Sequence, residues 1–232
     1  VFIHYQQYED AANILKQAEQ AEVESPVLKL YKVRLMRLKA WSDISVYQSD
    51  KEAEKILAEF LEQTVEDSLL ADLYYEMALI EDKQYYQPWV HEGKAKEYIC
   101  KAIELNQDPN YYYVYGNILF QDKEYKEALK QYEETERIGG ATENLYINMG
   151  RCYDELDILD RAIWYFTEAG KMDPENDRVN GYLGSVYTRL MEHGQSRECG
   201  ELAIKYTTLQ IERKGDNPFE YMDRCRVYLD MN

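Results

Sequence analysis

The sequence predicts an all-α protein built from repeated pairs of helices. Gly116, Gly150 and Gly184 follow one another at one constant interval. Self-similarity at a period of about 34 residues is the signature of a repeat architecture. Within the units, apolar residues recur at helical spacing, and Pro26 and Pro218 stand where helices are expected to begin.

The period decides how the stretch "YYYVYGNILF", residues 111–120, is read. Local propensity favours a β-strand, because aromatic and β-branched side chains suit a pleated surface. In the repeat frame, however, Tyr112, Tyr115, Gly116 and Leu119 form one stripe on a helix. We therefore predict a helix here, with Ala128 of the following helix packed against Gly116.

The segment "LYINMGRCYDELDILDRAIWYFTEAGKMDP", residues 145–174, resembles the tetratricopeptide repeat, whose pattern is W-x2-L-G-x2-Y, then A-x3-F, then P. Tyr146 stands in place of the Trp and Met149 in place of the Leu. The other pattern positions are matched by Gly150, Tyr153, Ala162, Phe166 and Pro174. The resemblance implies a right-handed superhelical solenoid of about six helix-turn-helix repeats with a C-terminal capping helix. It also implies that the first helices line a concave groove and that the second helices cover the back.

We divide residues 1–232, as one array, into successive units. They are a partial repeat (1–23), an irregular repeat (24–67), a repeat with an aromatic loop insertion (68–108), three further repeats (109–142, 143–176 and 177–213) and a capping helix (217–230). Ser25-Pro26 and Asn217-Pro218 supply N-terminal capping signals. A polar link, residues 42–50, is expected before the helix that begins at Lys51. Because the first repeat is incomplete, we expect the array to be part of a longer chain.

Two units depart from the pattern. In the third, Pro88 predicts a loop that carries Tyr85, Tyr86 and Trp89. These rings either fold over the apolar flank of the unit or dock a partner, since Tyr and Trp are favoured at interfaces. In the sixth, Ala203 follows Ala169 by one period, and Gly200 takes the place of the second-helix aromatic residue.

Composition disfavours several classes of binding partner. The net charge of −17 disfavours nucleic acid and anionic membrane surfaces, and we attribute it to solubility. No apolar run approaches the roughly 20 residues that a membrane span needs. Four widely spaced cysteines form no disulfide pattern, which favours a reducing compartment, and we expect the protein in the cytoplasm.

No catalytic pattern is visible in the sequence. The three histidines are far apart, and there is neither a P-loop nor a G-x-S-x-G nucleophile motif. We therefore expect no enzyme activity, no cofactor and no metal site.

Helical geometry predicts which residues face the groove. On the helix of Tyr112 they are Tyr113, Asn117 and Phe120. On the next first helix they are Ile147, Arg151 and Asp154, with Asn144 and Asn148 beside them. On the last they are Arg178, Tyr182, Ser185 and Arg189. Rings, amides and guanidinium groups suit an extended peptide, since Asn can hold its backbone and Arg can bind a carboxylate with two hydrogen bonds.

Chaperone-binding members of the family clamp a C-terminal carboxylate with Lys and Asn, then Asn, then Lys and Arg. Asn117, Asn148 and Arg178 match this set, but Tyr113 and Tyr182 replace two cations. The sequence therefore disfavours a clamp of the chaperone type, while Arg151 and Arg178 favour an acidic or C-terminal segment.

The predicted function is a non-enzymatic protein-protein interaction module that binds a peptide or partner protein in its groove. The alternative is a structural, oligomerising or regulatory segment of a larger chaperone-like or multidomain protein whose activity lies outside this chain. Self-association to a homo-oligomer, through the aromatic loop or the N-terminal end, is a further expectation.

Overall fold

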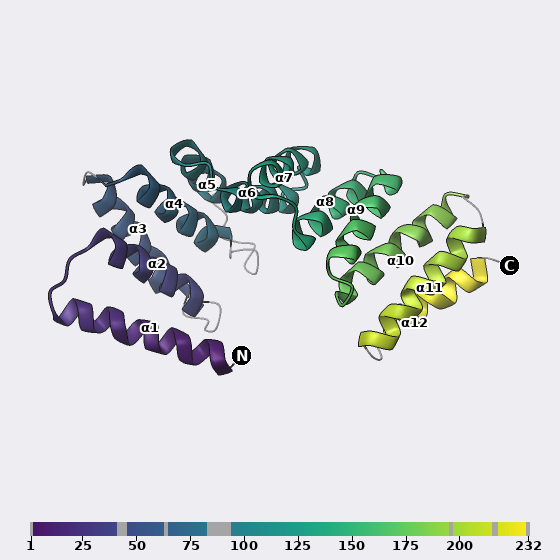
Figure 1. Ribbon diagram of the computed structural model, residues 1–232, viewed down its shortest axis with the longest axis horizontal. Coiled ribbons are helices and arrows are strands. Elements are labelled where there is room, and N and C mark those ends of the chain that lie inside the picture. The colour runs from purple at the N-terminus through teal and green to yellow at the C-terminus, as the bar shows by residue number, and fades with distance from the viewer. Residues whose placement is uncertain are drawn as a thin grey trace. The chain divides into compact units, whose positions relative to one another are not determined.

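The computed structural model describes residues 2–40, 46–62, 65–82, 94–194, 197–214 and 218–230 (Figure 1). All regular secondary structure among these residues is α-helical, which confirms the predicted all-α class. The chain divides into two compact units, unit 1 (Val1–Ile118) and unit 2 (Leu119–Asn232).

The helices fall into both units. Those that begin in unit 1 are α1 (Phe2–Gln20), α2 (Pro26–Ala40), α3 (Val46–Glu62), α4 (Asp67–Asp82), α5 (Lys94–Leu105) and α6 (Pro109–Gln121). Those of unit 2 are α7 (Tyr125–Gly139), α8 (Glu143–Glu155), α9 (Leu159–Met172), α10 (Asp177–Glu192), α11 (Arg197–Lys214) and α12 (Pro218–Asp230). No described helix combines the length and the apolarity of a membrane span.

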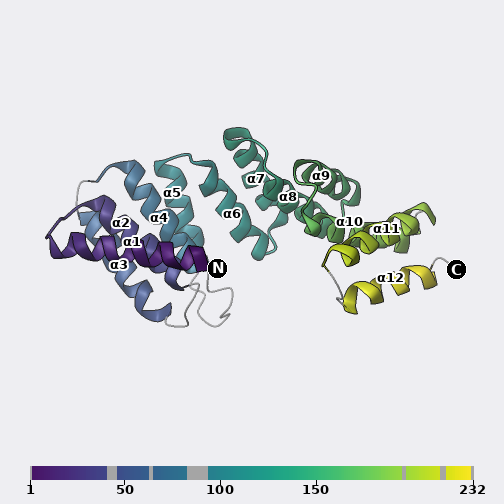
Figure 2. The ribbon, with the colours of Figure 1, turned by 60° about the horizontal axis from the view of Figure 1, so that its bottom comes forward.

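Helices pack as hairpins. In unit 1, α2 contacts α3 and α4 contacts α5; in unit 2, α8 contacts α9 and α10 contacts α11. The first helices of consecutive hairpins also touch, α2 with α4 and α8 with α10. At the C-terminal end, α12 lies beside α11 (Figure 2). Val227 of α12 is fully buried.

Two sequence-based expectations concern helix identity. Residues 111–120 lie inside α6, so the repeat period predicted their structure correctly where propensity did not. The link expected over residues 42–50 was partly wrong, because α3 begins at Val46. Its polar residues include no Pro or Gly, and polarity alone does not stop a helix.

Gly150 marks the closest approach of α8 and α9. A Cβ atom there would lie 2.7 Å from Cε1 of Phe166, whose ring is fully buried. Ala162, one turn before Phe166 on α9, is also fully buried. A residue without a side chain is therefore required on α8 to let the Phe166 ring fill the seam.

The turns inside the hairpins repeat as closely as the helices do. Lys123 and Asp157 occupy equivalent positions in consecutive repeats, and both adopt the left-handed conformation, with φ of 63° and 60°. In each turn a backbone amide returns to the helix before it, from Glu124 to the carbonyl of Leu119 and from Ile158 to the carbonyl of Tyr153, both at 2.9 Å. These bonds satisfy carbonyls that a helix end leaves unpaired.

The sixth repeat contains an insertion that sequence reading missed. A Cβ atom on Gly184 would meet Thr207 Cγ2 at 2.9 Å and the carbonyl oxygen of Ala203 at 3.8 Å, so Thr207 meets Gly184 as Phe166 meets Gly150. Thr207 lies about two helical turns, roughly seven residues, beyond the position one period after Phe166. Ala203 likewise lies about seven residues beyond the position one period after Ala162. Ala203 therefore occupies the place of Ala162, and its predicted equivalence to Ala169 was wrong.

Stacked tyrosines confirm the shifted register independently. Tyr153 of α8 stacks on Tyr165 of α9 with ring centroids 5.3 Å apart and an angle of 12°. Tyr187 of α10 stacks on Tyr206 of α11 at 5.7 Å and 2°. Tyr187 follows Tyr153 by one period, whereas Tyr206 follows Tyr165 by one period plus the insertion. The extra residues therefore lie between Tyr187 and Tyr206, at the end of α10 and the beginning of α11.

We expect Gly150→Ala to lower the free energy of unfolding by about 1–3 kcal/mol, because the added methyl group overlaps a buried ring that cannot move away. Urea unfolding followed by circular dichroism measures the change. Gly170→Ala is the matched control, since it adds a methyl group to α9, the other helix of the hairpin, where the nearest atom, Val179 Cγ1, lies at 3.2 Å. Equal stability of both variants would contradict the packing described here.

Candidate functional site

In unit 2, the first helices α8 and α10 lie side by side, and the last residues of α6 adjoin α8. We define the first-helix surface by the polar and aromatic side chains that these three segments present: Phe120, Asn148, Arg151, Asp154, Arg178, Tyr182 and Arg189. All seven of these residues were predicted from the sequence.

Arg151 is held in place at the centre of α8. Its guanidinium lies over the ring of Phe120, 4.3 Å from the centroid, and its Nη1 donates to Oδ1 of Asn148 at 3.4 Å. Phe120 is itself fixed by an edge contact with Tyr125, with centroids 5.3 Å apart. The structure thus brings Phe120, Asn148 and Arg151 together, and Arg151 has no ion-pair partner within the described residues.

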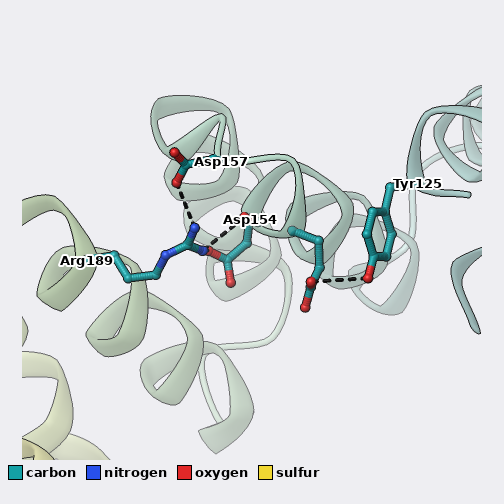
Figure 3. A network of polar contacts seen from close by, with 5 residues as sticks. Tyr125, Asp154, Asp157 and Arg189 are labelled. Carbon is teal, nitrogen blue, oxygen red and sulfur yellow. Dashed lines mark hydrogen bonds and ion pairs between the residues drawn. The ribbon is translucent and has the colours of Figure 1, made fainter. Parts of the chain in front are cut away.

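Arg189 of α10, by contrast, is neutralised (Figure 3). Its Nη1 bonds the carboxylate of Asp154 and donates to the Asp154 carbonyl oxygen at 2.9 Å, while its Nη2 lies 2.7 Å from Oδ1 of Asp157. Burial raises the pKa of Asp154, and the guanidinium of Arg189 opposes this by lowering it. These bonds fasten α10 to the end of α8.

The other predicted residues on α10 differ from each other in exposure. Arg178 is exposed, and its backbone amide donates to Asn176 Oδ1, the N-cap of the helix, at 2.9 Å. Its guanidinium forms no ion pair with any residue that the structure describes. Tyr182 is half-buried, because its ring stacks on Phe166 at 4.9 Å and 10°. Tyr182 therefore contributes to packing between repeats as well as to the surface.

Ile147 was wrongly predicted to face the groove. It is completely buried and belongs to the core of unit 2 with Leu159 and Val179. Because α8 packs against α7, α9 and α10, only part of its circumference remains for solvent. A pattern that identifies one packing stripe does not reveal a second one.

The remaining predicted residues lie elsewhere. Tyr113 and Asn117 are half-buried on the part of α6 that belongs to unit 1, and their role stays a prediction. Tyr85, Tyr86 and Trp89 lie outside the described residues. Among the described residues, no group of His, Cys, Asp or Glu is arranged to hold a metal ion.

Sequence reasoning missed an ionic centre in unit 1. Glu76 of α4 is almost completely buried and accepts from Nε of Arg34 at 2.6 Å and from Nε of Arg37 at 2.5 Å, both on α2. Close by, the hydroxyl of Tyr111 donates to Asp72 at 2.6 Å. A carboxylate inside the apolar run "LYYEMALI" was the available signal.

Unit 1 also has a cleft of about 1170 Å³ between α1, α2 and α3. Its apolar lining includes Leu15 and Leu28. Lys32 bridges Glu19 and Glu52 across its edge, at 2.9 Å from each. This lysine is therefore already paired with two carboxylates of the cleft edge.

Comparisons with known proteins agree with the repeat architecture. No protein-family model matches the sequence. The chain superimposes on YrrB, described as a TPR protein with an unusual peptide-binding site, with a TM-score of 0.63 and 16% identity over 91% of this chain and 97% of that one. For PilF of Pseudomonas aeruginosa the TM-score is 0.66 at 18% identity, over 87% and 83%. For MamA of Desulfovibrio magneticus RS-1 it is 0.62 at 20% identity, over 82% and 98%.

A sequence relative points the same way. The Hsp70-Hsp90 organizing protein of Triticum aestivum is 21% identical over 127 residues, which are 55% of this chain and 19% of that protein. The chain therefore spans about a fifth of this relative. Together these likenesses show the fold: it is that of the tetratricopeptide-repeat proteins, as the sequence resemblance predicted.

We expect Arg189→Gln to lower the free energy of unfolding by about 1–2 kcal/mol at pH 7, because Asp154 is left half-buried without its cation. Removing the guanidinium raises the pKa of Asp154 further. The folded variant then binds a proton more tightly than the unfolded chain does, so its stability increases as pH falls through the raised pKa.

The loss caused by Arg189→Gln should therefore be smaller at about pH 4.5 than at pH 7 in urea unfolding at both values. Arg137→Gln is the control, because it breaks an exposed pair with Glu134 on one helix, which contributes little. A loss for Arg189→Gln that does not exceed the control would refute the structural role of the Arg189 pairs.

Proposed function

We propose that the chain is a non-enzymatic protein-protein interaction module that binds an extended peptide segment on the first-helix surface of unit 2. The observation that carries the proposal is Arg151, a guanidinium fixed over Phe120 without a carboxylate partner among the described residues. The protein has 44 acidic residues and 27 Lys and Arg residues. An arginine that is positioned but not neutralised in such a chain is suited to a carboxylate from outside.

The contrast with Arg189 sharpens this assignment. The guanidinium of Arg189 is paired with the carboxylates of Asp154 and Asp157, and these pairs join α10 to the end of α8. Arg151 has one weak bond, to Asn148, so most of its five N–H donors remain for a ligand. A carboxylate that bonds two of them gains both energy and orientation, because charge-assisted pairs of this kind are short and directional.

The neighbouring groups suit the rest of a peptide. Asn148 carries an amide that can donate to a backbone carbonyl, and Phe120 offers an apolar face beside it. Arg178, exposed at the start of α10, provides a second cation for an acidic side chain or a C-terminal carboxylate. These features support an extended segment with an acidic residue or its C-terminus near Arg151.

The comparisons support the same class of function. YrrB, which is 16% identical to this chain and shares its fold, is described as having an unusual peptide-binding site. A peptide-binding site on the same fold favours an interaction module over a purely oligomerising segment. The four cysteines are free thiols, which supports a reducing compartment such as the cytoplasm.

The test uses an array of random-sequence decapeptides, each displayed with a free C-terminal carboxylate and in amidated form. We expect Arg151→Ala to weaken binding of the selected peptides by tenfold or more in fluorescence anisotropy, because a charge-assisted hydrogen bond contributes about 1.5–3 kcal/mol. Weaker binding on amidation would assign the C-terminal carboxylate, and weaker binding after Asp→Asn or Glu→Gln changes in the peptide would assign a side chain.

Arg161→Ala is the matched control, since Arg161 is an exposed arginine on the second helix of the same hairpin. It should leave the affinity of the selected peptides unchanged. Undiminished binding by Arg151→Ala, or an equal loss in both variants, would overturn the proposed site.

A further inference from the structure

We propose that unit 2 carries a second docking surface, on the side of its second helices, for an arginine- or lysine-rich segment of a partner protein. We call it the Trp164 surface and define it by Trp164, Tyr146, Tyr165, Glu133 and Glu136. It shares no residue with the first-helix surface, and it would select a ligand of opposite charge.

The surface is built on a cluster of three rings. Trp164 keeps 47% of its surface exposed, although it is among the largest apolar side chains. Its indole meets Tyr165 edge to face, with centroids 4.7 Å apart at 88°, and Tyr146 at 6.0 Å. Tyr146 and Tyr165 also contact each other at 5.3 Å and 82°. The indole is therefore fixed before a partner arrives, so binding costs little side-chain entropy.

A carboxylate of the preceding helix is bonded to this cluster. The hydroxyl of Tyr146 donates to Oε1 of Glu136 on α7 at 2.7 Å, and this bond raises the pKa of Tyr146 to about 12. The phenol therefore stays a donor at neutral pH, and Glu136 stays beside the rings. Glu133, one turn earlier on α7, is exposed and has no ion-pair partner within the described residues.

The local charge favours a cation. The carboxylates that act on the rings of Tyr146 and Tyr165 are Glu133, Glu136 and Glu168. Two cations of the same helices are paired with carboxylates, Lys171 with Glu168 at 2.6 Å and Arg137 with Glu134 at 2.7 Å. A guanidinium or ammonium group gains from the face of an indole and from carboxylates at its edge. A basic segment can use both groups at once, and an acidic segment is repelled.

Trp and Tyr are favoured anchors at the centre of an interface, whereas polar and charged groups belong to its rim. Trp164 would be the anchor, and Glu133 and Glu136 would set the sign of the partner. The long-range field of a chain with a net charge of −17 adds to the rate at which a basic partner arrives.

The test measures binding of a fluorescein-labelled decapeptide of alternating arginine and serine, and of the same peptide with citrulline in place of arginine. We expect the arginine peptide to bind and the citrulline peptide to bind far more weakly. Trp164→Ala should weaken the arginine peptide by about three- to tenfold, the range of a partly desolvated cation–π contact. Trp164→Leu, which keeps an apolar side chain over Tyr165, should show a similar loss.

Two controls separate the Trp164 surface from general charge attraction. Met172→Ala removes an apolar side chain of the same exposure, 47%, from the end of the same helix and should change the affinity less than twofold. Glu133→Gln with Glu136→Gln should weaken the arginine peptide more than Glu198→Gln with Glu201→Gln, which removes the same charge from α11.

Equal affinity of Trp164→Ala and the parent protein, or equal losses for the two Glu pairs, would overturn the proposal. Arg151→Ala should leave the arginine peptide unaffected, and Trp164→Ala should leave the carboxylate peptides unaffected. A failure of one surface is therefore distinguishable from a failure of the other.

Discussion

The close approach of two helices at a residue without a Cβ atom governs the architecture of unit 2. At Gly150, α8 comes so near to α9 that the Phe166 ring fills the seam. Both proposed surfaces follow from this contact. Arg151 is the next residue after Gly150 and so points about 100° away from the seam, and Trp164, two residues before Phe166, points about 200° away from it. Fixing the seam fixes what each helix presents to solvent.

Most of the fold could be predicted from the sequence because the repeat period carries more information than local propensity, as the helical residues 111–120 show. Two errors have physical causes. Ala203 is small enough to fit either register, and only the contacts of Gly184 with Thr207 distinguish them. Ile147 satisfies the spacing of a groove residue, yet it is buried because α8 has three packed neighbours. For the first-helix surface, the sequence predicts which residue types lie on which helix face. It does not predict their ion pairs, because the partners come from neighbouring repeats.

Arginines are positioned in two different ways in this acidic chain. Arg34 and Arg37 share the buried Glu76 and join α2 to α4. Arg189 joins α10 to α8 through two carboxylates and a carbonyl. Arg151 is positioned by a ring and an amide instead. The type of group that positions an arginine thus distinguishes Arg34, Arg37 and Arg189, which join helices, from Arg151, for which we propose a role in recognition. Sequence spacing alone does not make that distinction.

The insertion in the last repeat alters the height of its hairpin. The two hairpins can be aligned by their stacked tyrosines, Tyr153 and Tyr165 with Tyr187 and Tyr206. In this alignment α10 ends about one turn later than α8, and α11 begins about one turn earlier than α9. Three helical residues rise about 4.5 Å. The connected end of α10 and α11 therefore projects nearly one helical turn beyond the level set by α8 and α9. A partner could tell the fifth repeat from the sixth by relief as well as by side-chain chemistry.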